Sequence, residues 1–408
     1  MQDIEFREAV LPNGLTIQAE IIPTALTAAT GFFFRTGARD EDPEVMGVSH
    51  FLEHMMFKGT EKRTAEDVSR ELDELGANHN AWTTSENTAY FAHTPYDVLP
   101  QAVDVLADIL RPSLRQEDFD EEKQVILEEI AMYADQPFWV LYEQAMERYY
   151  GHNPIGHRVL GTVDTVSALT AEQMRTYFEN RYSADNTIVA ASGNVDFDAL
   201  VEQIERLCGH WPATNPTRQH APVPFTPGEI EVKLPENTSQ RYIVILSPSK
   251  AMNDESRYAA GQFAHCIGDA EGSNLFWAVV ENGLAEEAQM HFDGRDGCGE
   301  MAVTVVCSPE NAEEAEKIVR EELVNGYEKI NDDALARSRA KIATSVTLAS
   351  ERPMGRMTRL GVRWTYQLPY RTLDQELERI NEVTLQDIAD YQASCPMNEP
   401  LIARGGGN

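Results

Sequence analysis

Two histidines and a glutamate stand close together early in the chain, in the run His50-Phe51-Leu52-Glu53-His54. Residues four apart on a helix lie one above the other, so the imidazoles of His50 and His54 can converge on one ion, and Glu53 shares their face. Catalytic zinc takes three protein ligands and keeps one position for water. The run is the inverted form of the metalloprotease pattern His-Glu-x-x-His. It predicts a metal site with Glu53 beside it as proton acceptor. The alternative is that both histidines are ordinary surface or core residues.

A third ligand must come from another element, and a glutamate-rich segment offers candidates. These are Glu121, Glu122, Glu128 and Glu129. Glu122 and Glu129 are two helical turns apart and so share a face. One of them could bind the ion while the other hydrogen-bonds a ligand histidine. A solvated acidic face is the alternative interpretation of these glutamates.

The elements that must position these residues follow from apolar periodicity and turn residues. Helical spacing predicts a helix over 45–59 that ends at Gly59 and carries both histidines, and a second over 119–135 that carries the glutamates. Between them, residues 79–94 read as a hairpin around the turn Ser85-Glu86-Asn87. The metal site therefore requires the two helices to meet in the folded chain.

Charge and cysteine content narrow the class of protein. Of 408 residues, 34 are Lys or Arg and 67 are Asp or Glu, a formal charge of −33. This balance argues against binding to nucleic acid or to an anionic membrane. It could simply keep the protein soluble, or it could attract basic peptides. The five cysteines form no CxxC pair, which argues against a disulfide scaffold and a thiolate zinc site. With no visible signal peptide and no run of 18 apolar residues, we expect a cytoplasmic protein, or a periplasmic one if a signal was removed.

The second half of the chain repeats the first. Residues 170–194 align with 384–408 without a gap, pairing Thr170 with Thr384 and Tyr177 with Tyr391. Neither copy shows a βαβ rhythm, so we expect an α+β fold of two homologous domains, each a mostly antiparallel sheet with helices on one face. The expected division is 1–207 for a metal-binding domain, 208–228 for a proline-rich linker, and 229–408 for a homologous domain without a metal site.

The whole chain resembles a known family. The segments GVSHFLEHMMFKGT, NAWTTSENTAYF, HNPIGHRVLGTVDTV and NRYSADNTIVAASGNVD are similar, in the same order, to segments of the pitrilysin-type (M16) inverzincin metallopeptidases, most closely the short bacterial members related to the mitochondrial processing peptidase. The resemblance implies a zinc endopeptidase with one Zn²⁺ per chain. It assigns His50, His54 and Glu129 as ligands, Glu53 as the base and Glu122 as the supporting glutamate, with Glu128 as the alternative third ligand.

The resemblance also implies how substrate is held. Two similar lobes would close around a peptide or unfolded polypeptide, which binds as an added strand at a sheet edge before the zinc. Asn80 and Ala81 are expected on that edge, where their backbone groups need partners. Trp82, with Tyr90 and Phe91, could line a side-chain pocket. Alternatively, Asn80 only begins the strand and the aromatic residues belong to the core.

The second copy departs from the family. We expect residues 268–288 to be the counterpart of the metal-binding helix, and they carry no His-x-x-Glu-His. In this segment Asn274 and Glu286 replace an arginine and a tyrosine that contact substrate in many short members, so two donors for a substrate carbonyl are missing. A partner chain could supply them in a homodimer or heterodimer, or Arg295, Arg356 or Tyr366 could substitute. A non-catalytic or partner-dependent subunit is therefore the alternative to a peptidase active alone.

Overall fold

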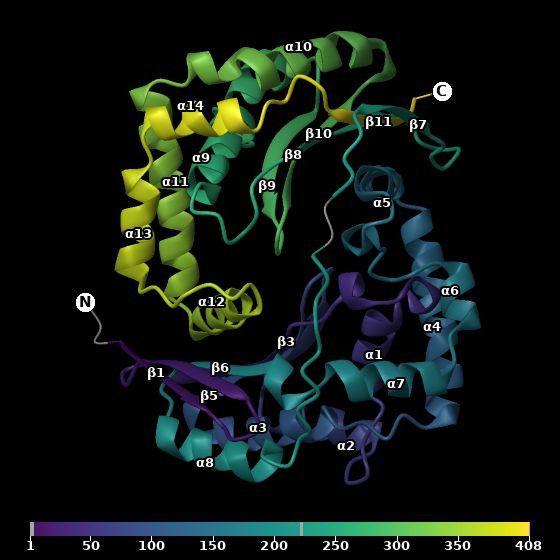
Figure 1. Cartoon of the computed structure of the whole chain (residues 1–408), viewed down its shortest axis with the longest axis vertical. Helices are drawn as coiled ribbons and strands as arrows, with labels where there is room; N and C mark the ends of the chain where they lie inside the picture. The colour runs from purple at the N-terminus through teal and green to yellow at the C-terminus, as the bar shows by residue number, and fades with distance from the viewer. Residues whose placement is uncertain (1–3, 221–222, 408) are drawn as a thin grey trace. The chain divides into compact units, whose positions relative to one another are not determined.

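The computed structural model describes residues 4–220 and 223–407, and these fold into two compact units (Figure 1). Unit 1 contains the residues up to Ile130, His157–Gln219 and Leu348–Tyr370. Unit 2 contains Ala131–Gly156, His220–Thr347 and the residues from Arg371 onward. Each unit thus draws a segment from the opposite half of the sequence, and the units do not coincide with the halves 1–207 and 229–408.

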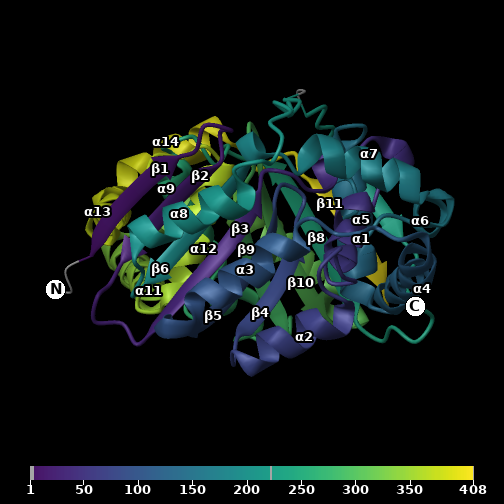
Figure 2. The same cartoon turned by 90° about the horizontal axis from the view of Figure 1, so that it is seen from below.

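Unit 1 is built on a six-stranded sheet in the order β1-β2-β6-β3-β5-β4. Strands β2 and β6 are parallel, and the other neighbours are antiparallel. Figure 2 shows β3, β5 and β4 side by side. The strands are β1 (Glu5–Val10), β2 (Thr16–Ile21), β3 (Thr27–Phe34), β4 (Asn78–Thr83), β5 (Thr88–Pro95) and β6 (Thr187–Gly193). Strand β4 forms one edge of the sheet.

Seven of the eight described α-helices that precede the linker bury one face of the sheet in unit 1. Side chains alternate along a strand, so Phe32 and Phe34 of β3 join the core under these helices while Phe33 points to the other face. The helices are α1 (Val48–Met56), α2 (Ala65–Glu74), α3 (Leu99–Ile109), α4 (Gln116–Ala134), α6 (Val163–Ala168), α7 (Ala171–Arg181) and α8 (Phe197–Cys208).

Unit 2 has a five-stranded sheet in the order β7-β11-β8-β10-β9, with β7 and β11 parallel and the rest antiparallel. Helices α9, α10 and α14 help to enclose the core on one face. The strands are β7 (Gly228–Val232), β8 (Arg241–Pro248), β9 (Glu287–Gly294), β10 (Gly299–Cys307) and β11 (Leu401–Gly406). The helices are α9 (Arg257–Gly268), α10 (Ala312–Asn325), α11 (Asp332–Ser350), α13 (Leu373–Glu382) and α14 (Leu385–Ser394), with a π-helical turn at Phe276–Val280.

The two units repeat one plan, which agrees with the two homologous domains that the sequence predicts. Strands β2, β6, β3, β5 and β4 match β7, β11, β8, β10 and β9 in order and direction. Thr170 and Thr384, which the sequence repeat pairs, each cap a helix by accepting a backbone N–H at 3.2 Å. The paired Tyr177 and Tyr391 each bond a serine hydroxyl at 2.7 Å.

The order of elements also corrects one expectation. In unit 1, helix α1, which carries His50 and His54, follows β3 and contacts α7. In unit 2 the helix that follows β8 and contacts α14 is α9. The counterpart of α1 is therefore α9, not residues 268–288. The sequence alone did not identify α9 as this counterpart, because α9 keeps the apolar face of α1 but has no equivalent of Glu53 or of the pair His50 and His54.

Each sheet is also covered on its second face by one helix that belongs to the other half of the sequence. Helix α12 (Pro353–Thr365) packs on β3 and β6 of unit 1, and α5 (Pro137–Tyr150) packs on β11 and β8 of unit 2. Both helices begin with proline, which suits the first helical turn. They occupy equivalent places after α4 and α11, so the exchange is reciprocal.

Helix α12 is fixed to its sheet by shape and by charge. Phe33 lies so close to Gly361 that a Cβ on Gly361 would meet its ring atoms at 2.4 Å. Beside this contact, Arg356 and Arg359 each donate to the buried carboxylate of Glu20 at 2.7 Å. Glycine at 361 is thus required by the close approach of the helix to the sheet.

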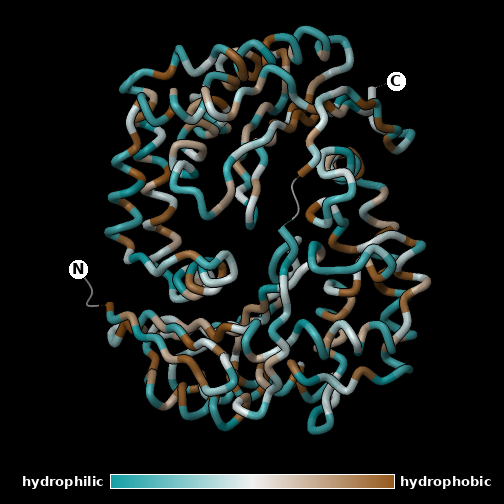
Figure 3. Tube along the Cα trace, viewed as in Figure 1, coloured by the Kyte–Doolittle hydropathy of each residue, from teal (hydrophilic) through white to brown (hydrophobic). Residues whose placement is uncertain are grey.

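Along the described residues, no helix combines the length and apolar character needed to cross a membrane. In Figure 3 the helices alternate between hydrophilic and hydrophobic colour, as expected for helices that bury one face.

Two helical glycines give a matched test of this packing. Gly361→Ala should destabilise the protein by about 1–3 kcal/mol because the new methyl group overpacks against Phe33. Gly261→Ala in α9 meets no atom within 4 Å and should be neutral or stabilising by up to about 1 kcal/mol, the difference in helix propensity. Urea unfolding followed by circular dichroism measures both. Equal stability of the two variants would contradict the close packing of α12.

Candidate metal centre

Helix α1 is held at its N-terminus by the buried carboxyl group of Glu41. The residue before the helix is Gly47, and two observations require glycine there. Its φ is +96°, and an added Cβ would lie 2.6 Å from the carbonyl oxygen of Leu160. Glycine has no capping side chain, so Glu41 accepts the N–H groups of Gly47 and Ser49 at 2.7 Å instead. Burial raises the pKa of Glu41 to about 8. These contacts fix the start of the helix that carries the histidines.

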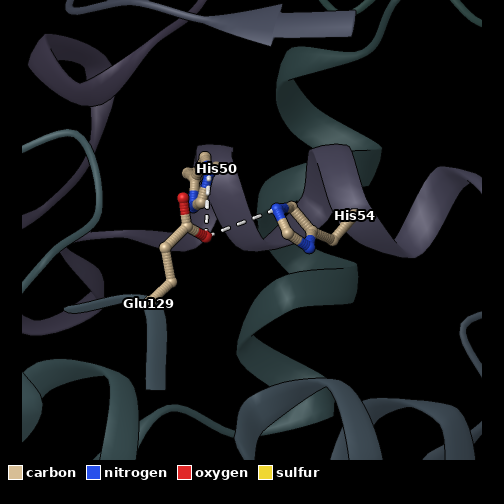
Figure 4. Close-up of side chains that lie close together, drawn as sticks. All are labelled: His50, His54 and Glu129. Atoms are coloured by element: carbon tan, nitrogen blue, oxygen red, sulfur yellow. Dashed lines mark ion pairs between the residues drawn. The ribbon is translucent and has the colours of Figure 1, made fainter. Parts of the chain in front are cut away.

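His50 and His54 point the same way from α1, with ring centroids 4.7 Å apart, and meet Glu129 of α4 (Figure 4). The Oε2 atom of Glu129 lies 3.8 Å from Nε2 of His50 and 3.7 Å from Nε2 of His54. Both distances are too long for hydrogen bonds. The three side chains therefore face one another across a space rather than bonding directly.

This space fits a metal ion. One donor atom from each residue lies within 4.8 Å of the others, and no second such group occurs among the described residues. Two ligands about 2.0–2.1 Å from tetrahedral zinc stand about 3.4 Å apart, so the two separations from Glu129 need to contract by only a few tenths of an ångström. Two imidazoles and a carboxylate are a ligand set that zinc favours, and they leave a fourth position open.

Glu122 contacts His54 at the ring nitrogen that does not face Glu129. It is buried on α4, and its Oε1 lies 2.7 Å from Nδ1 of His54, which leaves Nε2 to face Glu129. Lys58 forms an ion pair with the other oxygen of Glu122. Burial raises the pKa of Glu122, but the hydrogen bonds from His54 and Lys58 outweigh burial and lower it overall. Glu122 is therefore held as a carboxylate.

The two histidines differ in proton affinity. Burial, with a smaller effect from His54, lowers the pKa of His50 to about 4. Burial also acts to lower the pKa of His54, but the hydrogen bond and charge of Glu122 outweigh it, and the pKa is raised. His50 is thus neutral and ready to bind a metal near pH 7, while metal binding at His54 competes with a proton.

Glu53 is half-buried beside the site, close enough to His54 and Glu129 for their charges to affect its pKa. Its Oε2 accepts a hydrogen bond from Thr83 of β4 at 2.5 Å. Burial raises the pKa of Glu53 above its usual value, and the bond from Thr83 opposes part of this shift. A carboxylate with a raised pKa is better matched to accepting a proton near neutral pH.

The structure distinguishes the four glutamates among which the sequence left the third ligand open. Glu121 and Glu128 are exposed, whereas Glu122 and Glu129 turn toward α1. Sequence reasoning missed Lys58 and Thr83. Lys58 stands four residues after His54 and could have been found from that spacing, but Thr83 comes from a strand and gives no local signal.

The residues expected to bind substrate fall into two groups in unit 1. Asn80 is exposed on the edge strand β4, and its Oδ1 accepts the N–H of Ala81 at 2.9 Å. That N–H therefore points away from β5, toward the free side of the strand. Trp82 instead packs against Phe33 and Phe91, with centroids 5.6 and 5.3 Å away, in the core beneath α12. Tyr90 is wholly buried, so neither ring needs a substrate as partner.

In unit 2, Asn274 donates to the carbonyl oxygen of Gly326 at 3.0 Å, and the exposed Glu286 accepts from Gln240 at 2.6 Å. Of the possible replacements for the family's arginine, Arg295 is bound to buried Glu300 and Arg356 to buried Glu20. Both guanidinium groups are committed to structural ion pairs, which argues against their substitution for it. Tyr366 is half-buried at the end of α12.

Unit 2 repeats the scaffold of the site without its donors. Helix α9 has one histidine, His265, and no glutamate, and α11 has Ser338 and Ser345 at the places where the equally long α4 has Glu122 and Glu129. The same helices meet, but the side chains that would hold a cation are gone.

Comparison with known proteins places these observations in a family. The model of the insulinase family (peptidase family M16) matches residues 17–163, and that of the peptidase M16 inactive domain matches 168–342. An uncharacterized zinc protease of Streptomyces coelicolor is 35% identical over 94% of this chain and 85% of its own. The mitochondrial-processing peptidase subunit beta of Saccharomyces cerevisiae is 27% identical over 98% and 91%.

Solved structures agree on the fold. A protease from Helicobacter pylori superposes with a TM-score of 0.90 at 17% identity, covering 99% of this chain and 100% of that one. An M16-like peptidase from Alicyclobacillus acidocaldarius gives 0.85 at 20% identity, covering 100% and 99%. At these identities the likeness establishes the fold alone.

Two adjacent glutamates test the ligand assignment. Glu129→Gln should remove one donor and lower zinc affinity at least about 10- to 100-fold, whereas the exposed Glu128→Gln should leave it unchanged. Competition with a chromophoric chelator measures the affinity of each variant, independently of any activity. If Glu128→Gln is the variant that loses zinc, the third ligand is misassigned.

Proposed function

Because the chain belongs to the insulinase family of peptidases, peptidase family M16, we propose that it is a zinc-dependent endopeptidase acting on peptides or unfolded polypeptides. The observation that carries the proposal is the convergence of His50, His54 and Glu129 beside Glu53. A binding protein with no chemistry to perform would need neither an open set of metal donors nor a carboxylate of raised pKa next to it.

Zinc would be held, one ion per chain, by Nε2 of His50, Nε2 of His54 and a carboxylate oxygen of Glu129. When bound, it supplies Lewis acidity that polarises the scissile carbonyl and makes water a nucleophile near neutral pH. Glu122 keeps the proton of His54 on Nδ1, so that Nε2 presents its lone pair. Lys58 balances the buried charge of Glu122.

Glu53 acts as the base. It takes a proton from the attacking water and passes it to the leaving amine of the peptide. Thr83 fixes one oxygen of Glu53, which leaves the second free for the proton. Because Thr83 ends β4, the strand proposed to bind the substrate also orients the base.

The substrate binds as an extended strand added to the free edge of β4. The outward N–H of Ala81 is one of the groups that would pair with it, once the side chain of Asn80 turns aside. Main-chain pairing gives affinity with little dependence on sequence, which suits unfolded polypeptides. Trp82 contributes by supporting the strand from the core.

Replacing Glu53 separates metal binding from catalysis. Glu53→Gln should keep zinc at the wild-type level and lower kcat by about 10²- to 10⁴-fold, because the amide cannot accept the proton. Zinc content and cleavage of a quenched fluorescent peptide are measured on the same sample, with Glu121→Gln as an exposed control on α4. Cleavage by Glu53→Gln at the wild-type rate would show that another group is the base.

The chain would act as a homodimer or as a heterodimer with a related chain. Asn274 and Glu286 replace the arginine and tyrosine of many short family members, and the amide of Asn274 is committed to Gly326. One relative is named as a subunit, the mitochondrial-processing peptidase subunit beta. A non-catalytic or partner-dependent subunit remains the second candidate function for this reason. The five cysteines are free thiols, which supports a cytoplasmic location.

Introducing an arginine at Asn274 and a tyrosine at Glu286 tests whether activity depends on a partner chain. If the lone chain lacks them, Asn274→Arg with Glu286→Tyr should raise its kcat/KM at least about tenfold, because carbonyl-binding donors contribute that much or more. Asn274→Ala with Glu286→Ala removes the same native contacts without adding donors and should give no gain. An unchanged rate in the first double variant would mean that these positions do not limit activity.

A further inference from the structure

Part of the proline-rich linker lies in a buried cluster of charged side chains in unit 1. Asp40 binds two arginines there, Arg181 at 2.9 Å and Arg218 of the linker at 2.7 Å. Beside this group, Arg39 forms an ion pair with Glu86. None of these five side chains is more than 7% exposed. Charged groups are costly to bury without partners of opposite sign, so the cluster depends on the linker arginine being in place.

The backbone of the linker is bound by the same cluster. Arg181 donates to the carbonyl oxygen of Thr217 at 2.9 Å, and Arg39 donates to that of Gln219 at 3.1 Å. Arg218 stands between these two residues and contributes its own side chain. Three consecutive linker residues are therefore attached to unit 1, and this stretch is not a free tether.

Arg218 also reaches the turn of the β4–β5 hairpin. Its Nε and Nη2 atoms donate to the carboxylate of Asp40 at 3.1 and 2.7 Å, and Nη2 also donates to the carbonyl oxygen of Glu86 at 2.6 Å. A guanidinium presents its donors in a rigid plane, so one side chain can hold both acceptors at once. The linker is thereby joined to the turn.

This turn begins directly after Thr83, whose hydroxyl donates to Glu53 at 2.5 Å. Backbone N–H groups of residues 38–39 bind the carbonyl oxygens of the first two turn residues at 3.2 and 2.8 Å, and Arg218 binds the third, that of Glu86. These bonds fix the end of β4. They therefore also fix the hydroxyl that orients Glu53.

We propose that Arg218 of the linker is a positioning residue for the base Glu53, acting through the hairpin turn and the hydroxyl of Thr83. The inference rests on the proposed function, because Glu53 is a base only if the chain is a peptidase. It gives the linker a second role. Besides joining the two halves of the sequence, the linker contributes to the geometry of the active site.

A double-mutant cycle tests whether Arg218 acts through Thr83. Arg218→Met should lower kcat about 10- to 100-fold and leave zinc affinity unchanged, because a misplaced base is a less effective one. Thr83→Val removes the hydroxyl and keeps a similar shape, so in this background Arg218→Met should change kcat by less than about twofold. Cleavage of a quenched fluorescent peptide and competition with a chromophoric chelator provide the two measurements.

The control variant Arg206→Met removes an exposed arginine from the last turn of α8, also in unit 1, and should leave kcat unchanged. If Arg218→Met does not fold, Arg218→Lys takes its place. The single ammonium keeps a charge beside Asp40 but lacks the planar fork that holds both acceptors, so its loss of kcat should show the same dependence on Thr83. An equal loss in both backgrounds, or no loss in the parent chain, would overturn the inference.

A second measurement separates this inference from the proposed function. Amide hydrogen exchange over residues 83–88 should be faster in Arg218→Met than in the parent chain, because the turn loses one of its three bound carbonyl groups. A parent chain that cleaves no peptide would contradict the proposed function, while faster exchange in the variant would still support the hold of Arg218 on the turn. Unchanged exchange would overturn the inference whether or not the chain is a peptidase.

Discussion

The buried carboxylate of Glu122 joins the two helices on which the candidate site depends. It lies between His54 of α1 and Lys58 just beyond the end of that helix, while its own helix α4 carries Glu129 two turns further along the same face. A carboxylate in this position would be costly to bury without both partners. Its interactions bring α1 and α4 into one register, and that register sets the distances from Glu129 to both histidines. The same bond selects which nitrogen of His54 faces the site.

The N-terminal end of α1 is fixed by other hydrogen bonds. Glu41 accepts two N–H groups of the first turn, and Ser49 bonds the buried hydroxyl of Tyr177 on α7. The helix is thus anchored at both ends, so the imidazoles are positioned before any ligand binds. Thr83 extends this arrangement to β4, since it orients Glu53 from the strand at the sheet edge. The proposed metal ligands, the proposed base and the expected substrate strand therefore belong to one connected set of contacts within unit 1.

The two units share a scaffold but not the side chains of the candidate metal site. Both units build the same sheet and place equivalent helices on it, yet only unit 1 keeps metal donors among the described residues. In unit 2 the equivalent positions on α11 are serines. The reciprocal exchange of α5 and α12 means that neither half of the sequence contains all of its own core. Gly361 and Glu20 show how specific that exchange is, because one admits the helix and the other binds its arginines.

The sequence by itself determined the features that depend on local spacing. The four-residue interval places His50 and His54 on one helical face, the seven-residue interval does so for Glu122 and Glu129, and the repeat at residues 170–194 and 384–408 predicts two similar domains. Only the tertiary structure decided which glutamate faces the histidines, that Lys58 and Thr83 support them, that α9 is the counterpart of α1, and that α5 and α12 change places. These features arise from contacts between residues far apart in the chain, and helical or strand periodicity fixes the face of a side chain but not the element that will lie opposite it.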